Sequence, residues 1–145
     1  MILLDTNVVS EPLKLKGDVG VLTWIDAQNI ETLYLSTISL AELRFGIAAL
    51  APGKRRDTLQ DSLEQLILPL FAGRILPFDA AASEAYAALR SRARAQGKAI
   101  APADGYIAAT ASSHGLIVAT RDTGPFEAAG LSVINPWNMQ HEQTA

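Results

Sequence analysis

The sequence predicts an α/β protein: a three-layer α/β/α sandwich around a mainly parallel sheet of about five short strands. Short apolar runs alternate with longer segments in which apolar residues recur at helical spacing. These runs are apolar at successive positions, which is typical of parallel strands covered by helices on both faces. With 145 residues, 49% of them hydrophobic, the chain is expected to form one domain with a substantial core.

The expected strands are five short apolar runs: residues 2–4, 33–35, 75–76, 116–119 and 131–134. The expected helices lie between them: residues 18–29, 40–50, 54–70, 79–96 and 102–114, and a short one after Gly124. Several residues mark the ends of these helices. Ser39 and Glu42 are three apart, as in a capping box, and Pro102 suits the first turn of a helix. Apolar residues from Leu59 to Leu70 predict one long helix that ends near Pro69.

Composition excludes several kinds of site. The chain has no cysteine, so disulfides, thiolate nucleophiles and cysteine-ligated zinc are ruled out. It has two histidines, and His141 lies in a polar tail, so a histidine-rich metal site is not expected. No apolar run is long enough to cross a bilayer, and none resembles a leader. The sequence therefore predicts a cytoplasmic protein without a membrane partner, with a domain at residues 1–138 and a polar, flexible tail at residues 139–145.

Four acidic residues occupy comparable places in this pattern. Asp5 and Asp122 follow expected strands, while Glu42 and Asp104 lie in the first turns of expected helices. Strand exits and helix starts share one edge of such a sheet, and ligands bind outside the carboxyl ends of the strands. The four carboxylates are therefore expected to converge there.

Converging carboxylates repel each other, and a divalent cation relieves that repulsion. An oxygen-only ligand set favours Mg²⁺ or Mn²⁺ over zinc. Such a site can activate water and stabilise the charge of a phosphodiester during displacement. Thr6, Asn7 and Thr120 are candidates to orient the carboxylates or waters. Thr6 and Asn7 can equally serve only to start the next helix.

Each acid also has an ordinary structural explanation. Carboxylates at helix N-termini are stabilised by the helix dipole, by about 0.3–1 kcal/mol. The residues alone leave open whether these four acids form a metal site or are four independent helix caps.

Four ordered blocks of the sequence carry a family resemblance: LLDTNVVSE, ISLAELRFG, APADGYIAATA and VATRDTGPF. Together they resemble the PIN-domain family, most closely the VapC/FitB-type toxin components of bacterial toxin–antitoxin pairs. The resemblance extends from Met1 to Trp137, and both LPLFAGRILPFD and the closing NPW look FitB-like. The acids of the family fall on Asp5, Glu42, Asp104 and Asp122, without departure.

The resemblance implies a Mg²⁺- or Mn²⁺-dependent endoribonuclease with these four residues as catalytic carboxylates and metal ligands. Asp5 and Asp104 would be the primary ligands, and Thr120 would supply the hydroxyl of the fourth family motif. It also implies a homodimer and a small antitoxin whose C-terminal segment enters the acidic cleft. The antitoxin would bind operator DNA, so the complex would repress its own operon.

Basic residues form two runs despite a net charge of −3. The first is Lys54, Arg55 and Arg56; the second consists of Arg90, Arg92, Arg94 and Lys98. The first run, together with Arg121 beside Asp122, is a candidate for contact with RNA phosphates. Exposed, solvated helix faces explain both runs equally well, and Arg121 can instead pair with an acid.

Two other functions fit parts of this sequence. The protein can act mainly as a binding partner that locks an antitoxin into a DNA-binding repressor, with little activity of its own. A phosphatase with an aspartyl-phosphate intermediate also places an Asp after the first strand. It needs a second acid two residues later, where this chain has Asn7.

Overall fold

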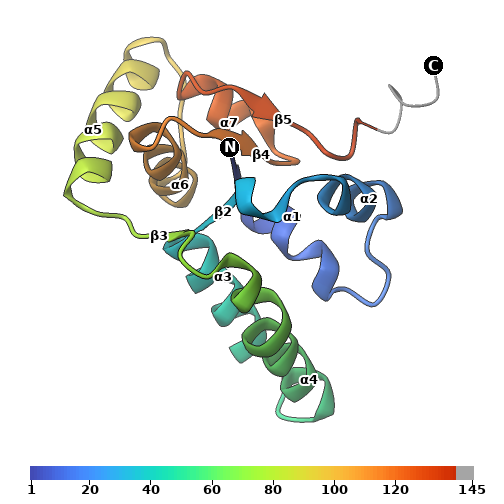
Figure 1. The fold of residues 1–145 in the computed structure, drawn as a ribbon. Helices are drawn as coiled ribbons and strands as arrows, with labels where there is room; N and C mark the ends of the chain where they lie inside the picture. Colours follow the sequence, from blue (N-terminus) through green and yellow to red (C-terminus); the bar gives the residue numbers. More distant parts are fainter. Residues whose placement is uncertain (140–145) are drawn as a thin grey trace.

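The computed structural model describes residues 1–139 and shows a five-stranded sheet with helices on both faces (Figure 1). All four strand pairings are parallel, and the strand order is β3-β2-β1-β4-β5. The strands are β1 (Ile2–Leu4), β2 (Leu33–Ser36), β3 (Ile75–Leu76), β4 (Ile117–Ala119) and β5 (Val133–Ile134). The predicted α/β sandwich around a parallel sheet is confirmed.

Seven α-helices and four short helical turns connect these strands within residues 1–139. The α-helices are α1 (Thr6–Val9), α2 (Val19–Ala27), α3 (Thr37–Ala48), α4 (Lys54–Ser62), α5 (Ala80–Ala95), α6 (Pro102–Ser113) and α7 (Thr123–Ala128). The short turns are η1 (Glu11–Leu13), η2 (Ile30–Thr32), η3 (Leu63–Ile67) and η4 (Leu68–Phe71). The predicted tail at residues 139–145 lies outside the described residues except for Met139, which packs against the core.

The two faces of the sheet carry separate cores. Ile2 and Leu4 of β1 point into one core, which is completed by α1, α2, α3 and the turn at Phe71. Leu3, between them, points into the other core, which is formed with α5, α6 and α7. Leu3 and Leu4 are almost fully buried, and the burial of each stabilises the fold by about 2 kcal/mol. Because β1 is buried on both faces, it is held rigidly, and so is the position of Asp5, which follows it directly.

Helices α5 and α6 pack closely because Gly105 has no side chain. A Cβ atom built on Gly105 would lie 2.9 Å from Cε2 of Tyr86. The rings of Tyr86 and Tyr106 stack beside this contact, with their centroids 4.7 Å apart. The approach fixes the first turn of α6, which contains Asp104, against α5.

Helix α3 begins earlier than the sequence predicted. Its N-cap is Ser36, whose Oγ accepts a hydrogen bond of 3.0 Å from the backbone N of Ser39. The predicted capping box of Ser39 and Glu42 is therefore wrong, and Glu42 lies in the second turn of α3 rather than the first. Ser36, Thr37 and Ser39 can each cap a helix, and the sequence pattern does not say which of them does so.

The predicted long helix at residues 54–70 is α-helical only as far as Ser62. A π-helical turn follows at η3 and a 3₁₀ turn at η4, which has Pro69 near its start. A π turn contains more residues than an α turn and rotates the following side chains around the axis. As a result Leu66 and Leu70 are exposed, although they fit the helical pattern of the sequence.

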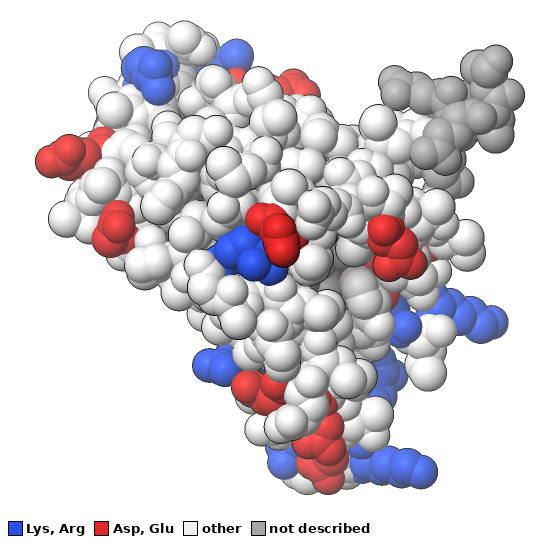
Figure 2. Space-filling model, viewed as in Figure 1, with Lys and Arg blue, Asp and Glu red and all other residues white. Residues whose placement is uncertain are grey.

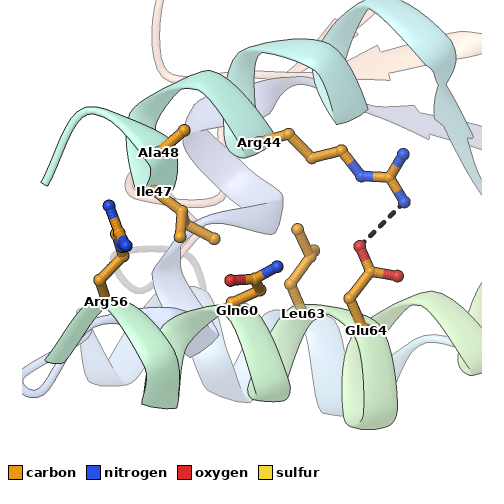
Figure 3. A pocket seen from close by; sticks show the side chains of 7 residues that line it. All are labelled: Arg44, Ile47, Ala48, Arg56, Gln60, Leu63 and Glu64. Carbon is orange, nitrogen blue, oxygen red and sulfur yellow. Dashed lines mark hydrogen bonds and ion pairs between the residues drawn. The ribbon is translucent and has the colours of Figure 1, made fainter. Parts of the chain in front are cut away.

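Helices α3 and α4 form a paired arm that projects from the sheet (Figure 1). The space-filling view shows positive and negative side chains gathered together on this arm (Figure 2). A cavity of about 310 Å³ lies between the two helices and is lined by Ile47, Gln60 and Leu63, among others (Figure 3). An ion pair of 2.9 Å between Arg44 and Glu64 lies beside this cavity.

Within residues 1–139 no helix has the length and apolar character needed to span a membrane.

Candidate functional site

The strand order creates a crevice between β1 and β4. The chain passes from β1 outward to β2 and β3, then returns to the other side of β1 to form β4 and β5. In parallel sheets this reversal is where ligands bind, outside the carboxyl ends of the strands. Asp5 follows β1 and Thr120 follows β4, so both residues lie at the mouth of this crevice.

Asp5 is buried and held at both carboxylate oxygens. Its side chain is 5% exposed. Its Oδ1 accepts a hydrogen bond of 2.8 Å from the backbone N of Thr6, and its Oδ2 accepts one of 2.8 Å from Oγ1 of Thr120. Asp5 is also the N-cap of α1. It is therefore a helix cap and a fixed carboxylate in the crevice at once, and the two explanations do not exclude each other.

Thr120 connects Asp5 to the loop that carries Asp122. Its hydroxyl is fully buried, donates to Asp5, and accepts a hydrogen bond of 3.1 Å from the backbone N of Asp122. Asn7 supports the same loop: its Nδ2 donates to Oγ1 of Thr120 at 3.5 Å, and its Oδ1 accepts from the backbone N of Arg121 at 3.2 Å. Thr120 and Asn7 therefore fix where the chain leaves β4.

Glu42 reaches the same crevice from α3. Its Oε1 lies 2.9 Å from Oγ1 of Thr6, which is also 3.0 Å from Oγ of Ser39. The Thr6 hydroxyl has one hydrogen, and it goes to the carboxylate because a carboxylate can only accept. The hydroxyl of Ser39 is then free to donate to Thr6. Ser39 is thus a part of the site that the sequence pointed to only as a helix cap.

Asp104 and Asp5 are coupled through their charges. Burial raises the pKa of the Asp5 carboxyl to about 6, and the charges of Asp104 and Glu42 add to the rise against two hydrogen bonds that lower it. Burial also raises the pKa of Asp104, with Asp122 and Glu42 as further causes. The structure thus brings all four predicted carboxylates close enough to act on one another.

The site residues suit a hard divalent cation in their chemistry. They offer mainly carboxylate and hydroxyl oxygens, and the pKa of Asp5 and Asp104 is raised first by burial and then by the neighbouring carboxylates. The ion pairs found in residues 1–139 both lie elsewhere. No three acidic or histidine side chains in this part of the chain stand where they could together hold a metal ion. A shared metal site therefore stays a prediction.

The predicted substrate-binding cations lie in two places. Lys54, Arg55 and Arg56 begin α4, at the far tip of the projecting arm, and the structure does not bring them to the carboxylates (Figure 1). Arg121 directly follows Thr120 and is exposed at the crevice. Its guanidinium lies over the ring of Trp137, 5.1 Å from the centroid. This stacking ties the closing NPW segment to the site, a connection that sequence reasoning missed.

Comparison with known proteins places the chain in a family. A profile described as PIN domain matches residues 2–131. The chain is 64% identical over 137 residues to a protein named VapC ribonuclease from Sinorhizobium fredii, covering 94% of this chain and 98% of the relative. It is 58% identical over 138 residues to Toxin FitB of Neisseria gonorrhoeae, covering 95% and 99%.

A solved structure of FitAB bound to a DNA fragment has the same fold. The TM-score is 0.92 at 56% identity, with 95% of this chain and 96% of that chain covered. The five-stranded parallel sheet, the carboxylates at its switch point and these likenesses agree. The chain belongs to the PIN-domain family and, within it, to the VapC/FitB type.

Proposed function

We propose that the protein is a Mg²⁺- or Mn²⁺-dependent endoribonuclease that acts as the toxin of a type II toxin–antitoxin pair. The observation that carries this proposal is the fixation of Asp5 at both oxygens, at the crevice where the charges of Asp104 and Glu42 act on it and where Asp122 acts on Asp104. A relative at 64% identity is named a ribonuclease and another at 58% a toxin, which supports the same reaction and role here.

In this proposal Asp5 and Asp104 are the primary metal ligands, and Glu42 and Asp122 complete the site. When bound, the ion would supply an activated water and neutralise charge on the phosphodiester. The chain's own residues supply the positioning. The Thr120 hydroxyl and the Thr6 backbone N–H hold the Asp5 carboxylate still, and the Thr6 hydroxyl orients Glu42. Buried ligands held in this way need little reorganisation when substrate binds.

The proposed partners follow from the same site. An antitoxin inhibits the enzyme by inserting its C-terminal segment into the acidic crevice, and its other end binds operator DNA. A cationic side chain on that segment would meet four carboxylates that lack a positive partner within the described residues. We further propose that the toxin works as a homodimer in the cytoplasm.

The test is RNA cleavage by the purified protein with Mn²⁺ or Mg²⁺, with Asp5→Asn as control and with the cleavage ends sequenced. We expect cleavage that needs the metal and disappears in the variant. A Mn²⁺-dependent rise in melting temperature, absent from the variant, checks the metal site without relying on activity. Cleavage of equal rate by Asp5→Asn would reject the proposal.

A second function is favoured by the FitAB structure, which holds a DNA fragment. In this second function, the protein mainly tightens the binding of operator DNA by its antitoxin, and the crevice serves as the docking site for the antitoxin. The result that would favour it is no cleavage of a broad RNA panel together with tighter operator binding by the antitoxin.

A further inference from the structure

A groove with a strongly positive lining lies along α5, outside the carboxylate crevice. It has a volume of about 550 Å³, and its polar lining consists of Tyr86, Arg90, Ser91, Arg94 and Lys98. No Asp or Glu of residues 1–139 lines it. We call it the basic groove. Figure 2 shows positive side chains over the end of α5 and the loop that follows.

Two features of the backbone bring the three cations together. Arg90 and Arg94 are four residues apart, so they share one face of α5 with a rise of about 6 Å between them. The chain then reverses at Gly97, which has a φ of +73°. The backbone N of Lys98 donates to the carbonyl of Ala93 at 2.8 Å, which turns Lys98 back toward the same groove. This is a helix-ending motif that needs glycine.

Among the described residues, the cations of the basic groove have no carboxylate partner. Both ion pairs in residues 1–139 lie elsewhere, at Lys14–Glu11 and Arg44–Glu64. Arg90 is fixed by aromatic contacts instead: its Nη1 donates to the hydroxyl of Tyr86 at 2.6 Å, and its guanidinium lies 5.4 Å from the centre of that ring. An uncompensated row of three cations on a protein with a net charge of −3 suits a chain of phosphates better than a single anion.

The wall of the basic groove touches the helical turn that carries Asp104. A Cβ atom on Gly105 would lie 2.9 Å from Cε2 of Tyr86 and 3.4 Å from Cδ of Arg90. Gly105 is the residue after Asp104, at the start of α6. A strand of RNA in the groove would therefore run past the first turn of α6, next to the carboxylates.

We propose that the basic groove binds the phosphodiester backbone of the RNA substrate beside the cleavage site. This inference rests on the proposed ribonuclease function. It deepens that function by naming Arg94 and Lys98 as the residues that contact the phosphates of the RNA. The Tyr86 ring is already in contact with Tyr106 and with the Arg90 guanidinium. It is therefore not available to stack on a base, and the groove contacts phosphates instead.

The test is binding of a fluorescein-labelled oligouridine in EDTA, with every protein in the Asp5→Asn background so that cleavage does not interfere. The groove variant is Arg94→Gln/Lys98→Gln. The matched control is Lys16→Gln/Arg92→Gln, which removes the same charge from two exposed residues that do not line the groove. Circular dichroism verifies that each variant is folded, and Arg94→Ala/Lys98→Ala repeats the test with smaller side chains.

We expect the groove variant to bind roughly 25-fold more weakly at about 0.1 M salt, with a salt slope smaller by about 1.4, because each phosphate contact contributes about 0.7 to that slope. The control should change little. Equal weakening in both variants would overturn the groove and indicate non-specific attraction. A change of oligomeric mass in the groove variant, with unchanged RNA binding, would also overturn it and indicate a contact between copies.

Cleavage kinetics separate this inference from the function on which it rests. In protein that keeps Asp5, the groove substitutions should raise KM and leave kcat unchanged, because their contacts lie away from the reacting atoms. A cleaving wild-type protein with unchanged KM in the groove variant overturns the groove alone. Absence of any cleavage, with groove-dependent binding of oligouridine, rejects the ribonuclease and leaves the groove as an RNA site.

Discussion

Asp5 and Glu42 lie at the same sheet edge, and the protein holds them in opposite ways. Asp5 is buried between two strands, with both carboxylate oxygens hydrogen-bonded and its pKa raised to about 6. Glu42 is exposed on α3, with the Thr6 hydroxyl as the hydrogen-bond partner found for its side chain. Burial of the Asp5 carboxylate, the inner one, costs free energy, and its hydrogen bonds hold it rigidly. The exposed Glu42 carboxylate, the outer one, costs little free energy to place and is free to move. Placement inside the sheet thus provides precision, and placement on a helix provides adaptability.

The largest contrast is expected in cleavage. Asp5→Asn should lower the rate of RNA cleavage by more than about 100-fold, because loss of a support for a metal ligand already costs roughly 10–100-fold. Glu42→Gln should lower the cleavage rate by a smaller factor, because water can take the place of the exposed Glu42 carboxylate. Single-turnover assays in Mn²⁺ measure both. Equal losses would mean that the inner and outer carboxylates contribute alike.

The same substitution should stabilise the metal-free fold. Because the pKa of Asp5 is higher in the folded protein than its usual value of 3.8, the folded state binds more protons than the unfolded state between about pH 4 and 6. Stability therefore falls as pH rises through this window, by roughly 3 kcal/mol. Asn cannot ionise, so the advantage of Asp5→Asn over the wild type should grow across the window and stay level above it.

Urea unfolding in EDTA measures this advantage, with Asp26→Asn, an exposed residue of α2, as the control. A difference between Asp5→Asn and the wild type that does not vary with pH would show that burial does not raise the pKa of Asp5.

A smaller effect should follow from removing the hydroxyl that holds Asp5. Thr120→Val keeps the shape but loses the bonds to Asp5 and to the backbone of Asp122, so Mn²⁺ affinity should fall by about 10–100-fold. Thr110→Val is the matched control, because Thr110 is equally buried and its hydroxyl bonds within α6. Titration calorimetry distinguishes the two. A similar loss of affinity in both variants would assign the effect to general destabilisation.

The smallest effect is expected at the outer carboxylate. Thr6→Val removes the hydroxyl that orients Glu42 but leaves the backbone N–H that holds Asp5. We expect cleavage to fall by less than about tenfold, the lower limit for losing the support of a rigid ligand. If Thr6→Val lowers the cleavage rate as much as Thr120→Val does in the same assay, Glu42 is as constrained as Asp5 and the contrast between the two carboxylates fails.

The strands and the strand-end acids could be predicted because both depend on local pattern. The buried run Ile2–Leu4 and its end at Asp5 follow directly from apolar residues followed by polar ones. The start of α3 could not be predicted, because Ser36 and Ser39 are chemically equivalent as caps and tertiary contacts choose between them. The π turn at Leu63–Ile67 also left no signal, since it keeps apolar residues at spacings that fit an α-helix.

The parts of the site formed by long-range contacts were the least predictable. Thr120 was a candidate supporting residue both from its place after a strand and from the family resemblance, but its bond to Asp5 spans 115 residues of sequence and depends on β1 and β4 being neighbours. The stacking of Arg121 on Trp137 likewise depends on where the chain returns after β5. The basic groove requires Gly97 to reverse the chain at the end of α5. The sequence pointed to the first basic run, Lys54 to Arg56, as the RNA contact and did not single out the second run.

The double duty of Asp5 as helix cap and carboxylate has a genetic consequence. Asn caps helices as well as Asp does, and a single nucleotide substitution converts an Asp codon into an Asn codon. Under the proposed function, an allele carrying Asp5→Asn would therefore encode a folded copy without nuclease activity that still offers its crevice to the antitoxin. Under the same proposed function, this one substitution would let the gene persist without harm to its host in a lineage that has lost the antitoxin.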